Sequence, residues 1–113
     1  MSQITTHVLD TSSGKPAAGI AIVLEALSGD GHWKALGVGI TNVDGRLPGL
    51  LPAHKKLPPG IYRLLFATGD YYKSQGIEGF YPAVTIEFET RDETHYHVPL
   101  LLNPYGYSTY RGS

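Results

Sequence analysis

Histidine, arginine and tyrosine side chains in this sequence could together carry out hydrolysis. A histidine can act as the base, because its ordinary pKa of about 6.5 lies close to neutrality. Arg46 follows directly after the tight-turn sequence at 42–45, so its root is fixed, and its guanidinium could stabilise an oxyanion. The same positive charge would disfavour a neighbouring imidazolium and keep the histidine a free base. Tyrosine and a terminal serine add hydrogen bonds that suit a polar ring.

Two other kinds of chemistry have weaker support. There is no cysteine, no Gly-x-Ser-x-Gly elbow and no Ser/His/Asp order, so covalent catalysis is disfavoured. A metal could be held by His95 and His97, whose side chains share a face, with His7, His32 or His54 as a third ligand. No carboxylate or thiolate falls at a matching spacing, so we predict neither a metal nor a cofactor.

The last four residues, 110–113 (Tyr-Arg-Gly-Ser), are expected to be ordered. Chain ends usually lose order unless a strand or helix ties them down. Here Pro and Gly in 103–106 favour a reversal, and the Tyr and Thr residues that follow favour a short strand. A docked end would bring a phenol, a guanidinium, a hydroxyl and the terminal carboxylate together. The alternative is an ordinary last strand with a solvated end.

Length and composition limit the class of protein. The 113 residues correspond to one domain, 1–113, large enough to fold around its own core. The absence of cysteine fits a reducing compartment. A net charge of −1 does not point to nucleic acid or an anionic membrane as a partner. The N-terminal residues lack a secretory signal and no apolar run could span a membrane, so we expect a cytoplasmic location.

Short strand-forming runs separated by turn residues predict an all-β fold, an antiparallel β-sandwich. The run at 20–27 is nearly continuously apolar, which indicates a central strand. Residues 47–57 contain two prolines and suit an edge strand or a loop. One short helix is expected within 69–79, with Asp70 as its N-cap. The expected strands span 4–10, 20–27, 32–41, 61–68, 82–90 and 94–102, with a hairpin turn at 91–93.

Strand parity places two candidate histidines on the outer face of a sheet. His7 points away from the side of Val8, and His97 points away from the side of Val98 and Leu100. If the first and the late strands are neighbours, the two imidazoles meet. The alternative is a solvated face, which antiparallel sandwiches commonly show.

Four segments spread over the whole chain match one protein family. They are 6–10 (Thr-His-Val-Leu-Asp), 41–46 (Thr-Asn-Val-Asp-Gly-Arg), 95–102 (His-Tyr-His-Val-Pro-Leu-Leu-Leu) and 110–113 (Tyr-Arg-Gly-Ser). Through them the sequence resembles the 5-hydroxyisourate hydrolases, the transthyretin-related proteins of urate breakdown. The final tetrapeptide is the most specific segment, because it separates the hydrolases from hormone-carrying transthyretins.

The resemblance implies a transthyretin-like sandwich of two four-stranded sheets, assembled as a homotetramer with active sites in a channel at the dimer–dimer interface. It also implies hydrolysis of 5-hydroxyisourate to 2-oxo-4-hydroxy-4-carboxy-5-ureidoimidazoline in purine degradation. Carried over by motif, His7, Arg46, His97 and Ser113 would be catalytic. His7, Arg46 and Tyr110 would contact the substrate.

Three questions stay open at the level of sequence. The same fold would support a carrier that binds a small aromatic ligand, although a polar and basic channel lining suits a purine derivative better. A bare sandwich module for protein contact is a further alternative, and it predicts a monomer. Neither the identity of the general base nor the contacts of His95 follow from the sequence.

Overall fold

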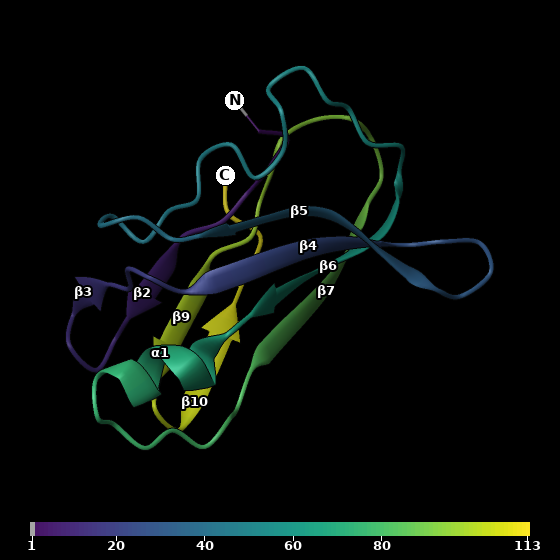
Figure 1. Ribbon diagram of the computed structural model, residues 1–113. Coiled ribbons are helices and arrows are strands. Elements are labelled where there is room, and N and C mark those ends of the chain that lie inside the picture. The colour runs from purple at the N-terminus through teal and green to yellow at the C-terminus, as the bar shows by residue number, and fades with distance from the viewer. Residues whose placement is uncertain (1) are drawn as a thin grey trace.

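The computed structural model describes residues 2–113 (Figure 1). Within this range no helix is long and apolar enough to cross a membrane. Strands dominate the regular structure, and the elements in chain order are β1 (Ile4–Thr5), β2 (Val8–Asp10), β3 (Lys15–Pro16), β4 (Ala21–Leu27), β5 (Trp33–Ile40), β6 (Gly60–Phe66), α1 (Thr68–Ser74), β7 (Val84–Thr90), β8 (Tyr96–His97), β9 (Leu100–Asn103) and β10 (Gly106–Thr109).

Two four-stranded sheets form a sandwich, which confirms the predicted fold class (Figure 1). One sheet has the order β10-β9-β2-β3 and the other β5-β4-β6-β7. Strand β4 pairs with β5 on one side and β6 on the other, so the apolar run is central as predicted. Both sheets contribute to the core, where Leu24, Leu64, Phe66 and Leu100 are fully buried. Each such side chain contributes about 1.5–3 kcal/mol on burial.

The predicted hairpin at 91–93 is wrong. Strand β7 pairs with β6, whereas β8 pairs in parallel with β1, with Thr5 opposite His97. The chain between β7 and β8 therefore leaves the β5-β4-β6-β7 sheet and joins the separate two-stranded sheet that β8 forms with β1. Strands β2 and β9 are also parallel, so the sandwich is not purely antiparallel. Alternation in a sequence predicts which side chains face the core, but it does not identify the partner strand.

The first and the late predicted strands are each interrupted. Residues 4–10 form β1 and β2, and residues 94–102 contain β8 and the start of β9, with the break at Val98 and Pro99. Proline has no N–H to donate to a sheet. The predicted parity is nevertheless confirmed, because Val8 and Leu100 are fully buried while His7 and His97 are partly exposed.

Helix α1 confirms the one predicted helix but not its cap. The N-cap residue is Ala67, which makes no side-chain capping bond, and Asp70 lies inside the first turn. A carboxylate in that turn still interacts favourably with the helix dipole.

Residues 47–57 form turns and irregular chain rather than an edge strand. Part of this loop lies over the site described next.

Candidate active site

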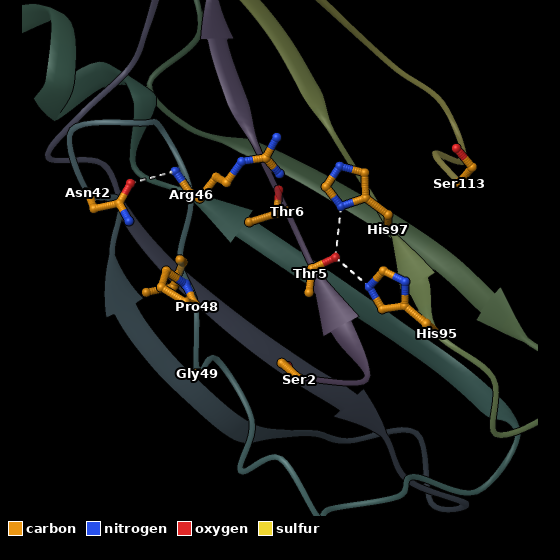
Figure 2. Close-up of a pocket in the computed structure, with 11 residues that line it drawn as sticks. Ser2, Thr5, Thr6, Asn42, Arg46, Pro48, Gly49, His95, His97 and Ser113 are labelled. Carbon is orange, nitrogen blue, oxygen red and sulfur yellow. Dashed lines mark hydrogen bonds between the residues drawn. The ribbon is translucent and has the colours of Figure 1, made fainter.

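A cavity of about 440 Å³ lies where β1, β8, the segment after β5 and the C-terminal residues meet. Cavities of this size commonly hold small organic ligands. Figure 2 shows imidazole, guanidinium, hydroxyl and amide groups around it. The residues that line it are Ser2, Thr5, Thr6, Asn42, Arg46, Leu47, Pro48, Gly49, His95, His97 and Ser113.

A hydrogen-bonded turn fixes the backbone position from which the Arg46 side chain extends. The Oδ1 atom of Asn42 accepts hydrogen bonds from the backbone N–H groups of Asp44, at 2.9 Å, and of Arg46, at 3.1 Å; Figure 2 shows the bond from Arg46. Gly45 has φ +72°, and a Cβ there would lie 2.4 Å from the carbonyl oxygen of Val8. Only glycine suits both the left-handed backbone and this close approach. The turn therefore holds Arg46 against the first-strand segment. There the backbone of Arg46 forms an antiparallel β-bridge with the backbone of His7.

His97 is held on two edges of its ring. Its Nδ1 atom lies 2.8 Å from the hydroxyl oxygen of Thr5, which also lies 2.7 Å from Nε2 of His95. On another edge, a Cβ added to Gly112 would lie 2.5 Å from Cδ2 of His97. The rings of His95 and His97 are stacked, with centroids 6.3 Å apart. In Figure 2 the second ring nitrogen of His97 faces the side of the cavity where the Arg46 guanidinium lies.

The surroundings of His97 favour its neutral form. Burial lowers the pKa of its imidazole below the ordinary 6.5, and the charge of Arg46, followed by His95 and His7, lowers it further. A neutral imidazole at neutral pH can accept a proton. Among residues 2–113, no carboxylate lies within ion-pair distance of the Arg46 guanidinium. That positive charge can therefore act on a ligand in the cavity.

The C-terminal tail docks beside His97, which is one of the two alternatives that the sequence left open. The backbone N–H of Gly112 donates to the carbonyl oxygen of His97 at 2.8 Å. The guanidinium carbon of Arg111 lies 4.3 Å above the ring centre of Tyr96, in a cation–π contact. These two contacts bring Ser113 to the cavity wall.

Three of the five predicted site residues line this cavity within one chain: Arg46, His97 and Ser113. His7 does not line it, although its charge acts on His97 and its backbone bridges to Arg46. Tyr110 also lies outside the cavity, with 58% of its surface exposed.

Four polar residues that line the cavity were given no role from the sequence: Ser2, Thr5, Thr6 and Asn42. Thr5 contacts the His97 ring, and Asn42 closes the turn before Arg46. Their contacts depend on the parallel pairing of β1 with β8 and on the closed turn. Within the described residues, no three or more His, Cys, Asp or Glu side chains are grouped to hold a metal ion.

Comparisons with known proteins bear on the family of this chain. The model of the HIUase/Transthyretin family matches residues 4–112. The 5-hydroxyisourate hydrolase of Mus musculus is 49% identical over 114 residues, covering 99% of this chain and 96% of that protein.

Two solved structures are also similar. A structure of Klebsiella pneumoniae 5-hydroxyisourate hydrolase has a TM-score of 0.83 at 36% identity, covering 97% of this chain and 98% of the other. A structure of sea bream transthyretin with thyroxine has a TM-score of 0.92 at 29% identity, covering 98% and 95%. Because the family model matches nearly the whole chain, the chain belongs to the HIUase/Transthyretin family.

Proposed function

We propose that this protein hydrolyses 5-hydroxyisourate to 2-oxo-4-hydroxy-4-carboxy-5-ureidoimidazoline, a step in purine degradation. The observation that carries the proposal is one cavity in which a neutral imidazole, His97, and an unpaired guanidinium, Arg46, lie together. A base and an oxyanion donor are what amide hydrolysis requires. The 49% identity to a relative named for this reaction supports the same assignment.

In the mechanism that we propose, His97 is the general base. Its Nε2 atom accepts a proton from water while the water oxygen bonds to the carbonyl carbon of the cyclic amide. Arg46 stabilises the negative charge that develops on the carbonyl oxygen. When the tetrahedral intermediate collapses, the ring C–N bond breaks and the ring nitrogen receives the proton from His97. The products of this cleavage are a ureido group and a carboxylic acid, which releases its proton to water and is a carboxylate near neutral pH. No cofactor enters this scheme.

His7, Tyr110 and Ser113 are assigned to the same reaction. Ser113 lines the cavity and could bind the substrate with its hydroxyl. His7 and Tyr110 lie outside the single-chain cavity, and Tyr110 is largely exposed. We therefore assign their substrate contacts to a homotetramer, in which a second protomer encloses the site at the dimer–dimer interface. The functional unit would be one domain, residues 1–113, working in the cytoplasm, which is consistent with the lack of cysteine.

A carrier function is the alternative, because the sea bream protein of similar structure was solved with thyroxine. A carrier site for a hydrophobic phenol is expected to be mostly apolar. The cavity here also carries the polar groups of Arg46, His95 and His97, which suit a hydrogen-bonding purine derivative better. Tighter binding of an iodinated phenol than of a urate analogue would favour the carrier.

The deciding experiment follows the ultraviolet absorbance of freshly generated 5-hydroxyisourate with and without the protein. We expect the wild type to accelerate its decay and His97→Asn to lose about 100-fold or more of that rate. His32→Asn is the matched control, because its side chain is 83% exposed and lies in the turn between β4 and β5. No acceleration by the wild type would refute the hydrolase assignment, and light scattering that shows only a monomer would refute the shared site.

A further inference from the structure

One hydroxyl group connects the two histidines of the cavity. The Oγ1 atom of Thr5 lies 2.7 Å from Nε2 of His95 and 2.8 Å from Nδ1 of His97 (Figure 2). The position of Thr5 is fixed by the parallel β1–β8 pair, in which its carbonyl oxygen accepts the N–H of Val98 at 2.9 Å. The hydroxyl therefore lies between the two rings because of backbone pairing.

The hydroxyl has a single proton, and this couples the protonation states of the two rings. Thr5 can donate to only one ring nitrogen, so the other nitrogen must donate to Thr5. If Thr5 donates to His95, then His97 carries its proton on Nδ1 and its Nε2 is free. If Thr5 donates to His97, then both rings carry their proton on Nε2. Neutral His95 and His97 must therefore share one tautomer.

The surroundings of His97 favour the arrangement with a free Nε2. In Figure 2 the edge of the ring with this nitrogen faces the Arg46 side of the cavity. A guanidinium only donates hydrogen bonds, so a lone pair facing it is more favourable than a second N–H. The charged or titratable side chains that affect the pKa of His97 are Arg46, His95 and His7. Ser113 lines the same cavity. None of the three side chains that act on His97 is an anion.

We infer that Thr5 is a positioning residue that holds His97 in the Nδ1–H tautomer, with its Nε2 free for proton transfer, and that His95 is the acceptor that orients the Thr5 hydroxyl. In this arrangement His97 can take a proton on Nε2 without any rearrangement of the bonds to Thr5. A neutral hydroxyl and imidazole thus take the orienting role that a carboxylate has beside the histidine of a Ser-His-Asp triad. The catalytic consequence rests on the proposed function, but the tautomer does not.

The tautomer is measured directly by long-range ¹H–¹⁵N correlation spectra of the uniformly ¹⁵N-labelled protein near neutral pH. The His97→Asn spectrum assigns the signals of His97. We expect both His95 and His97 to be protonated on Nδ1 in the wild type. Protonation of either ring on Nε2 would overturn the inference.

The kinetic test compares Thr5→Val, which keeps the side-chain shape, with Thr5→Ser, which keeps the hydroxyl. We expect Thr5→Val to shift His97 toward the Nε2–H form and to lower kcat by roughly 10- to 100-fold with little change in KM. Thr5→Ser should restore both the tautomer and kcat, which a purely structural role of the threonine methyl would not allow. If the wild type shows the shared tautomer but does not hydrolyse 5-hydroxyisourate, the proposed function fails and the role of Thr5 stands.

Discussion

The backbone of Gly112 lies directly against the ring of His97. Its N–H donates to the carbonyl oxygen of His97 at 2.8 Å, and an added Cβ would lie 2.5 Å from Cδ2 of the same ring. The C-terminal tail therefore packs against the His97 imidazole and limits the positions that the ring can take. The Thr5 contact at Nδ1 and the Gly112 contact at Cδ2 leave the Cε1–Nε2 edge of the ring, which faces the Arg46 side of the cavity in Figure 2.

Gly112→Ala should therefore displace the His97 ring and lower kcat. A misplacement of about 1 Å in a catalytic group can cost about 100-fold in rate, so we expect a loss of that order. Steady-state kinetics and a thermal melt measure the effect. Gly106→Ala is the matched control in the same segment, because its Cβ would meet only Asn103 atoms at 3.7 Å or more. Equal activities of the two variants would show that the tail does not position His97.

Removing the charge of Arg46 should move the pH dependence of the reaction. The proposed base must be neutral, so the rate falls as the pH drops through the pKa of His97. That pKa lies below 6.5 in the wild type, through burial and then the charge of Arg46. Arg46→Gln removes this cation, so the pKa of His97 rises and the acidic limb of the pH–rate profile moves to higher pH. The loss of the oxyanion donor should also lower kcat about 100-fold or more.

Arg46→Lys separates the two roles of this residue. Lysine keeps the positive charge but lacks the planar donor fork. We expect its acidic limb to stay near that of the wild type while kcat still falls. An acidic limb that does not move in Arg46→Gln would contradict an electrostatic effect of Arg46 on the catalytic base.

Local sequence signals predicted the residues of the sheets more successfully than the way in which the strands pair. Alternation correctly placed Val8 and Leu100 in the core and the two candidate histidines on the other face. The apolar run at 20–27 correctly indicated a central strand. The hairpin at 91–93 was wrong because the choice of partner strand depends on long-range packing, which alternation does not encode.

The same distinction applies to the site. The turn sequence at 42–45 was recognisable locally, and the docked tail was one of two alternatives for the last residues; in the structure they bring Arg46 and Ser113 to the cavity. Thr5 could not be recognised, because its contacts with His95 and His97 exist only when β1 and β8 run in parallel. Threonine on the outer face of a strand is otherwise an ordinary residue.

The docking of the tail can be tested at Arg111, whose guanidinium carbon lies 4.3 Å above the ring centre of Tyr96. The hydroxyl of Tyr96 also donates to Asp92 at 2.9 Å, so this ring joins the tail to the chain between β7 and β8. Arg111→Ala should lower the free energy of unfolding by about 0.5–1 kcal/mol, the usual size of an exposed cation–π contact. Because a looser tail would also release Ser113 from the cavity wall, we expect KM to rise.

Denaturant unfolding and steady-state kinetics measure the two effects of Arg111→Ala separately. Arg91→Ala is the control, because it also removes one arginine and its side chain is 79% exposed. We expect Arg91→Ala to leave KM unchanged, since Arg91 does not line the cavity. If both variants raise KM equally, the effect comes from the lost charge and not from the docking of the tail. A rise confined to Arg111→Ala would instead show that the cation–π contact keeps Ser113 at the site.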